Sequence, residues 1–150
     1  MKTLFSLVFL LSFTGALPPL PDAAVYSDNP DVGIEASLLP DSARSGDTVE
    51  LLLLFSPGRA IHIPAKPLMV FTLDSSVSAS LAGPPVRSID QTTGFLSNGS
   101  PVRQAIRLLP GTGPGLRILR GTVSYYYCSD SDGWCRKFRQ PVELSLVLTE

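Results

Sequence analysis

Short apolar runs that alternate with polar residues, separated by turn-forming residues, dominate the chain. Residues 32–39 place Val, Ile, Ala and Leu at every second position, and residues 102–109 and 142–148 repeat that spacing. Alternation with a period of two is typical of β-strands that bury one face, because successive side chains point to opposite sides of a sheet. No segment shows sustained helical periodicity, so the pattern predicts an all-β protein.

Other segments complete this pattern. Residues 48–56 hold a continuous apolar run bounded by glycine and proline, which predicts a central strand covered on both faces. Two prolines make residues 59–67 an edge strand or an irregular crossover. Further strands are predicted at residues 68–73, 77–81, 86–89 and 116–127. Seven or eight strands at this spacing, with turns between them, predict an antiparallel β-sandwich, with a barrel as the alternative.

The N-terminal segment differs from the rest of the chain. It has a positively charged start, a short apolar run and small residues that end at Ala16. This order predicts a signal peptide over residues 1–16, and the apolar run is too short to span a bilayer. Residues 17–31, rich in proline and aspartate, are predicted to be an extended linker, and residues 32–150 the β-sandwich domain. We therefore expect an exported protein, periplasmic or secreted, without a membrane span.

Composition narrows the function classes. The chain of 150 residues has the length of one domain, and its net charge of −1 implies no broad attraction to nucleic acid. The lone histidine, His62, lies between two isoleucines and is interpreted as structural or surface-exposed. A metal site built from His62 and one or both cysteines would have few ligands, so no metal or other cofactor is expected.

Residues 123–142 concentrate the reactive chemistry of the chain. They hold both cysteines, Cys128 and Cys135, together with three of the four tyrosines and the only tryptophan. Two cysteines in an exported protein normally pair. If the flanking strands form a hairpin, the two residues face each other near its end, within the reach of a disulfide. Closing so short a loop stabilises a fold by only about 2.5 kcal/mol, which favours a functional role over a staple.

The neighbouring charges distinguish the two sulfurs. Arg136, Lys137 and Arg139 follow Cys135 directly, and nearby cations stabilise a thiolate. Two aspartates of the intervening loop act in the opposite direction and lie closer to Cys128. Cys135 is therefore the predicted exposed nucleophile. The candidates for contacts with a partner protein are Tyr126, Trp134 and Arg136.

The same stretch resembles a known family. The run Tyr125-Tyr126-Tyr127-Cys128, the acidic loop that ends in Gly133-Trp134-Cys135, and the strand that follows are similar to the N-terminal domain of the periplasmic thiol:disulfide interchange protein DsbD. Related stand-alone or appended sandwich domains share this pattern. The segments Ser45-Gly46-Asp47-Thr48-Val49, Ile61-His62-Ile63 and Lys66-Pro67-Leu68 are consistent with the resemblance.

The resemblance implies an immunoglobulin-like sandwich and a redox function. Its cysteine pair would cycle between dithiol and disulfide and pass electrons to or from thioredoxin-fold or other envelope proteins. Cys135 would attack or be attacked by the partner, and Cys128 would resolve the mixed disulfide. The alternative hypothesis is a non-catalytic secreted binding or structural β-sandwich whose disulfide staples a hairpin.

Overall fold

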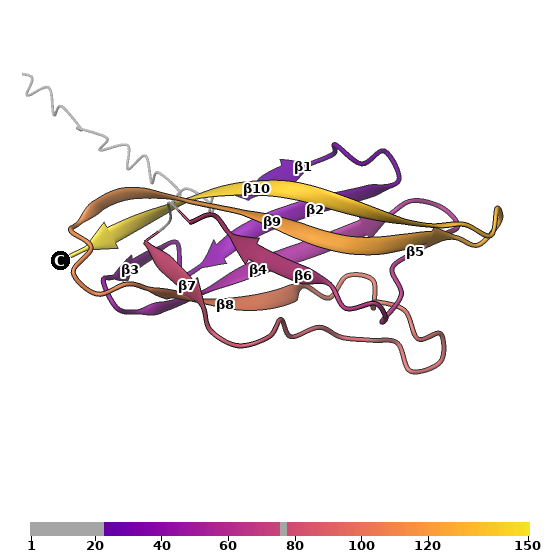
Figure 1. Cartoon of the computed structure of the whole chain (residues 1–150), viewed down its shortest axis with the longest axis horizontal. Helices are drawn as coiled ribbons and strands as arrows, with labels where there is room; N and C mark the ends of the chain where they lie inside the picture. The colour runs from indigo at the N-terminus through magenta and orange to yellow at the C-terminus, as the bar shows by residue number, and fades with distance from the viewer. Residues whose placement is uncertain (1–22, 76–77) are drawn as a thin grey trace, which may run out of the picture.

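A computed structural model describes residues 23–75 and 78–150, and the predicted signal peptide lies outside these residues. The described chain forms strands joined by turns and loops, and none of its segments is a helix long and apolar enough to cross a membrane (Figure 1). The strands are β1 (Ala24–Tyr26), β2 (Val32–Leu39), β3 (Ser42–Arg44), β4 (Thr48–Pro57), β5 (Ile61–His62), β6 (Val70–Leu73), β7 (Ala79–Leu81), β8 (Val102–Leu108), β9 (Gly115–Ser129) and β10 (Cys135–Thr149).

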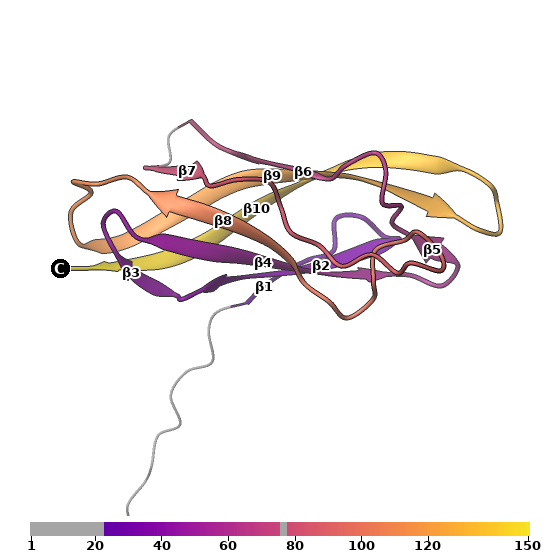
Figure 2. The same ribbon diagram turned by 90° about the horizontal axis from the view of Figure 1, so that it is seen from below.

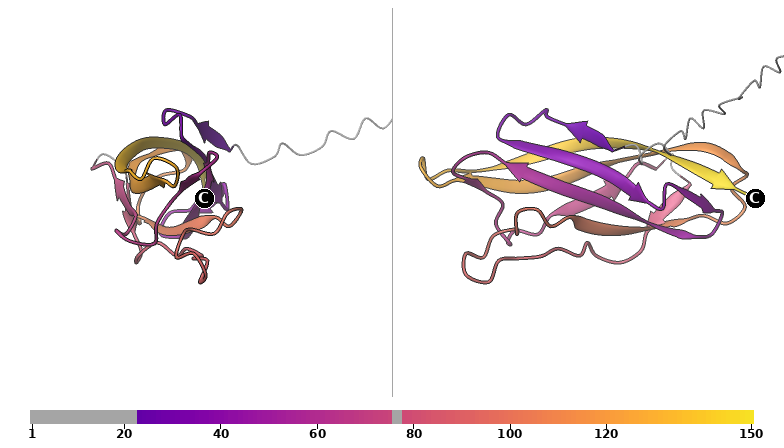
Figure 3. Two further views of the ribbon diagram at one scale, coloured as in Figure 1. Left: turned by 90° about the vertical axis from the view of Figure 1, so that its right-hand side faces the viewer. Right: turned by 180° about the vertical axis from the view of Figure 1, so that it is seen from behind.

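The strands form two sheets that pack face to face. The first sheet has the order β1-β2-β4-β8-β7, and the second has the order β3-β10-β9-β5, with β6 also paired to β9. Figure 3 views this sandwich end on and from behind. The predicted all-β class and antiparallel β-sandwich are confirmed, whereas the immunoglobulin-like arrangement stays a prediction. One pair departs from the antiparallel rule, because β3 runs parallel to β10.

A long hairpin of β9 and β10 runs the full length of the molecule (Figures 1 and 2). Its pairing extends without a break from Cys128 opposite Cys135 to Gly115 opposite Leu148. Every second residue of both strands points into the core, as the alternation in the sequence predicted. The buried residues that β9 and β10 contribute are Leu119, Val123, Tyr125, Tyr127, Val142, Leu144, Leu146 and Leu148.

The prediction that residues 48–56 are covered on both faces is wrong. In β4, Leu51 and Leu53 are each 1% exposed, whereas Leu52 and Leu54 on the other face are only half-buried. A sandwich covers one face of each sheet, so the second row of leucines lies on the outer surface. The continuous apolar run therefore reflects an apolar outer face and does not mark a third layer.

Three further boundaries differ from the sequence prediction. The described part of the predicted linker contains β1, which pairs with β2, and the predicted turn after β2 contains β3. Both are three-residue edge strands, too short to show a period of two. Residues 86–89 make only two isolated bridges, Val86 to Arg103 and Ile89 to Leu96, because the prolines before them interrupt pairing.

Gly121 of β9 is a place where two strands approach closely. A Cβ atom there would collide with the backbone oxygen of Thr72 and would lie 2.7 Å from the ring of Phe71. Both neighbours belong to β6, which pairs with β9 at this point. The missing side chain thus lets β6 close over the middle of the hairpin.

We expect Gly121→Ala to destabilise the protein by about 1–3 kcal/mol, because a backbone atom must move to admit the methyl group. The control is Gly33→Ala in β2, where a Cβ would meet only Ser56 at ordinary contact distances of 3.8 and 3.9 Å. Denaturant unfolding of both variants measures the effect. Equal stabilities of the two variants would contradict the prediction.

Candidate functional site

The predicted disulfide between Cys128 and Cys135 is present, at the tip of the β9–β10 hairpin. The tip lies at the end of the molecule opposite the C-terminus (Figure 1). Next to it, the Ser129 N–H donates to the Trp134 carbonyl oxygen at 2.9 Å. Hydrogen-bonded and non-hydrogen-bonded pairs alternate along an antiparallel ladder, so the cysteines occupy a non-hydrogen-bonded pair, in which side chains lie closer. Their Cα atoms are 4.0 Å apart.

The two cysteines differ in exposure. Cys128 is 6% exposed, whereas Cys135 is on the surface. The sheet order explains the difference: β9 has β10 on one side and β5 on the other, with His62 opposite Cys128. At Cys135, β10 is paired with β9 alone among the described strands. Cys135 is therefore the half of the disulfide that another protein can reach.

The loop between the cysteines is held by one side chain. The Ser129 hydroxyl accepts from the Asp132 N–H at 3.2 Å and donates to the Asp132 carboxylate at 3.3 Å. The Gly133 N–H donates to the Ser129 carbonyl oxygen at 3.0 Å, and Gly133 has a φ of 69°, a conformation that glycine adopts without strain. These bonds give the tip a defined shape around the disulfide.

The three residues predicted to contact a partner lie on two different faces of the hairpin. Tyr126 shares the outer face with the disulfide, since it stands two residues from Cys128. Trp134 and Arg136 lie on the opposite face. There the Arg136 guanidinium stacks 4.1 Å from the centre of the Trp134 ring, and that ring packs edge-on against Tyr127 at 5.6 Å. The structure thus does not bring the three residues into one patch.

This arrangement corrects the expected electrostatics of Cys135. Arg136 directs its charge to the face away from the disulfide and binds the Trp134 ring. Lys137, two residues after Cys135, is the first cation on the disulfide's own face, with its ammonium 5.9 Å from the centre of the Tyr126 ring. Successive side chains of a strand point to opposite faces, so Arg136 does not lie beside the Cys135 sulfur although it follows Cys135 in sequence.

His62 belongs to the same end of the molecule, although no pattern in the sequence predicted a partner for it. Its Nδ1 lies 2.8 Å from the Asp130 carboxylate. This contact does not have hydrogen-bond geometry, and the buried Nδ1 forms no hydrogen bond with the described residues. The ring stacks on Phe95 with centroids 3.6 Å apart. His62 is thus held from two sides beside Cys128. The described residues contain no group of three or more His, Cys, Asp or Glu that could bind a metal ion.

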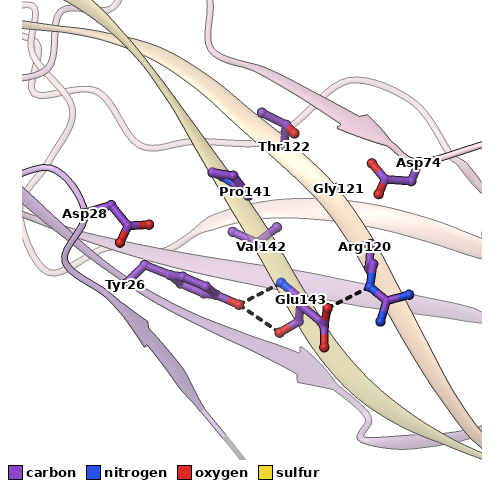
Figure 4. Close-up of a pocket in the computed structure, with 9 residues that line it drawn as sticks. All are labelled: Tyr26, Asp28, Asp74, Arg120, Gly121, Thr122, Pro141, Val142 and Glu143. Atoms are coloured by element: carbon purple, nitrogen blue, oxygen red, sulfur yellow. Dashed lines mark hydrogen bonds and ion pairs between the residues drawn. The ribbon is translucent and has the colours of Figure 1, made fainter.

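Sequence reasoning missed a second cluster of polar residues, shown in Figure 4. It lines a hollow of about 330 Å³ where the end of β1 and the residue that follows β6 meet β9 and β10. The Tyr26 hydroxyl donates to the Glu143 carbonyl oxygen and accepts from the Glu143 N–H, both at 2.7 Å. The Glu143 carboxylate also pairs with Arg120 at 2.6 Å. Tyr26 thereby closes the backbone edge of β10, a role that no local pattern around it indicates.

Comparison with known proteins identifies no relative by sequence: no family model matches the chain, and no curated protein matches it. Among solved structures, the crystal structure of the yeast GGA1 GAE domain is similar, with 13% sequence identity and a TM-score of 0.43. The match covers 81% of this chain and 98% of that chain.

Tyr125 connects the hairpin to the opposite sheet and lies in the centre of the core. It is 1% exposed, accepts a hydrogen bond from the buried Asn29 side chain at 3.0 Å, and packs edge-on against Phe55 at 5.2 Å. Burial raises the pKa of Tyr125 to about 12. The Asn29 hydrogen bond opposes this shift and Tyr127 adds to it. The phenol therefore keeps its proton at pH values that ionise an exposed tyrosine.

We expect the free energy of unfolding to fall by up to about 3 kcal/mol between pH 10 and pH 12, because only the unfolded phenol ionises there. Tyr125→Phe should lose most of this dependence, while Tyr126→Phe, which alters a half-buried tyrosine on the outer face, should keep it. Denaturant unfolding across this pH range provides the measurement. An unchanged slope in Tyr125→Phe would refute the assignment.

We also expect Tyr26→Phe to destabilise the protein by about 1–2 kcal/mol, because it removes a hydroxyl that makes two hydrogen bonds. The uncovered edge should in addition increase self-association. Denaturant unfolding and analytical ultracentrifugation measure the two effects. Tyr126→Phe is the control, since the Tyr126 hydroxyl makes no hydrogen bond to a described residue. A variant that is monomeric and as stable as the control would disprove the role of Tyr26.

Proposed function

We propose that the chain is an extracytoplasmic thiol–disulfide exchange module that passes electrons through Cys128 and Cys135 to or from a partner protein. The observation that carries the proposal is the unequal exposure of the pair, with Cys135 on the surface and Cys128 buried. Exchange proceeds by in-line attack of a thiolate on one sulfur of a disulfide, so one accessible sulfur and one shielded sulfur suit a directed reaction.

In the oxidised form, a partner thiolate attacks Cys135 Sγ. A mixed disulfide forms, the Cys128–Cys135 bond breaks, and Cys128 leaves as a thiolate that takes a proton from solvent. A second partner thiolate then attacks the partner's sulfur in the mixed disulfide and releases Cys135. The partner loses two electrons and the pair gains them. In the reverse direction, the Cys135 thiolate attacks a partner disulfide and Cys128 resolves the intermediate.

Two further features support this proposal. The predicted signal peptide directs the chain to a compartment in which disulfides form and exchange. The resemblance of the cysteine hairpin to the N-terminal domain of the DsbD family favours thioredoxin-fold or other envelope redox proteins as partners. Lys137, on the face of the disulfide, adds a positive charge that stabilises a thiolate at Cys135.

The second candidate is a secreted binding or structural sandwich with a stapled hairpin. It is favoured by the position of the disulfide at the last opposed pair of the long β9–β10 ladder, where a hairpin end otherwise frays. In that case the bond has no exchange partner, and its role is to keep the tip closed. The two candidates differ in how easily the bond is reduced.

The exchange function predicts a reduction potential above about −300 mV, since structural disulfides typically lie below that value. Equilibration of the full chain with glutathione buffers of defined ratio measures it. In the single-cysteine variants, Cys128→Ser should form a mixed disulfide with oxidised glutathione about tenfold or more faster than Cys135→Ser, because only Cys135 is exposed.

Unfolding measurements on both variants serve as the control, since both lose the same bond. A potential well below about −300 mV would exclude exchange and leave the staple. Equal reactivity of the two variants would show that exposure does not select Cys135 as the attacked sulfur.

A further inference from the structure

The backbone groups of β10 that face away from β9 belong to its odd-numbered residues. The Ser129–Trp134 hydrogen bond fixes this order, because hydrogen-bonded and non-hydrogen-bonded pairs alternate along the β9–β10 ladder. Residues of the non-hydrogen-bonded pairs direct their N–H and C=O groups away from the partner strand. Two bonds on the far side of β10 agree with it. Glu143 exchanges hydrogen bonds with the Tyr26 hydroxyl, and the Val147 N–H donates to the Asp41 carbonyl oxygen at 3.1 Å.

Most of this outer edge is closed. β3 pairs with β10 at residues 147–149, and the Tyr26 hydroxyl binds both backbone groups of Glu143. Pro141 has no N–H that could donate a hydrogen bond. Pro141 also faces outward, which is where a strand tolerates proline. The longest stretch of outward-facing groups without a partner among the described residues is Cys135, Lys137 and Arg139. The open segment of β10 is therefore Cys135 to Arg139, beside the exposed half of the disulfide.

The open segment is strongly basic. Arg136, Lys137 and Arg139 are exposed, and Phe138 between them is half-buried. The nearby acids lie at its two ends. Asp28 accepts a hydrogen bond from Gln140 at 2.7 Å, and Asp130 and Asp132 are in the hairpin loop, where they contact His62 and Ser129. Three cations in four residues thus line an edge whose backbone donors and acceptors are free to bind.

We propose that the edge of β10 from Cys135 to Arg139 binds an acidic, extended segment of a partner protein as an added strand. Backbone hydrogen bonds from Cys135, Lys137 and Arg139 would hold the segment, and its carboxylates would pair with the three cations. Strand addition to an exposed edge is a general mode of peptide recognition, in which the main chain gives affinity and side chains give selectivity. This docking does not depend on the disulfide being reducible.

A second copy of this chain fits the edge poorly. An antiparallel pairing of two β10 edges centred on Lys137 would place Lys137 opposite its own copy and Cys135 opposite Arg139. Like charges directly opposed across two strands are destabilising. The same cations that attract an acidic segment therefore repel self-association, so a stretch that no described residue covers is protected from pairing with a second copy.

The docking also fits the proposed function, where that function holds. A segment paired with Cys135 runs past the accessible sulfur, so a cysteine within the segment would be delivered to Cys135 without a separate recognition surface. The test nevertheless uses peptides without cysteine, so that failure of docking and failure of exchange give different results.

The test is a selection of cysteine-free ten-residue peptides from a random displayed library against the full chain. We expect the selected peptides to be acidic. Binding of each peptide is then measured to two variants. Lys137→Pro removes an outward N–H that β9 does not use and should weaken binding about tenfold or more, whereas Lys137→Thr removes only the charge and should weaken it about two- to threefold.

A second measurement leaves the protein unchanged, in case Lys137→Pro fails to fold. Methyl groups on the peptide nitrogens that face β10 should weaken binding to the wild-type chain about tenfold, and methyl groups on the alternate nitrogens should have little effect. The Cys128→Ser/Cys135→Ser double variant should bind the same peptides. Selection of no acidic peptide, or equal binding of both methylated forms, would overturn the proposal and leave the cations as protection against aggregation.

Discussion

The pairing of β9 with β10 is the interaction on which the rest of this structure depends. It is continuous from Gly115 and Leu148 to Cys128 and Cys135, and it supplies one wall of the core through alternate residues of both strands. Strand pairing of this length fixes register, because a slip by one residue would turn every core side chain toward solvent. The same register brings the two cysteines into opposition. The disulfide is therefore a consequence of core packing as well as a bond at the tip.

The neighbours of the hairpin then make its two strands unequal. β9 has partners on both sides, so Cys128 is buried although it lies on the outer face, while β10 has an outer edge that only short segments of the described chain cover. The position of β10 at the edge of the sheet near Cys135 explains both the exposure of Cys135 and the availability of its backbone groups. An interior strand and an edge strand joined by a disulfide give a bond with one shielded and one accessible side, without any special chemistry at the sulfurs.

The sequence predicted what depends on neighbouring residues and missed what depends on distant ones. Alternation in residues 32–39, 102–109 and 142–148 located strands and their buried faces, since a period of two is a local property. The bonds of Tyr26 to Glu143 and the stack of His62 on Phe95 join segments remote in sequence, and no spacing marks them. Arg136 shows a related error. Its position next to Cys135 in sequence suggested that its charge lies near the sulfur, but alternation along the strand puts the two side chains on opposite faces.

Coverage of the β10 edge is uneven, and the covered and uncovered parts differ in the charge of their side chains. Where the neighbouring residues are neutral or acidic, as at Pro141 and Glu143, the edge is closed by a ring or a hydroxyl. Where three cations crowd the strand, none of the described segments pairs with its outer edge. An uncharged open edge invites indiscriminate pairing, whereas a basic one admits only segments whose charge offsets its own. An edge of this kind combines resistance to aggregation with selectivity, and at Cys135 it places that selectivity beside the accessible sulfur.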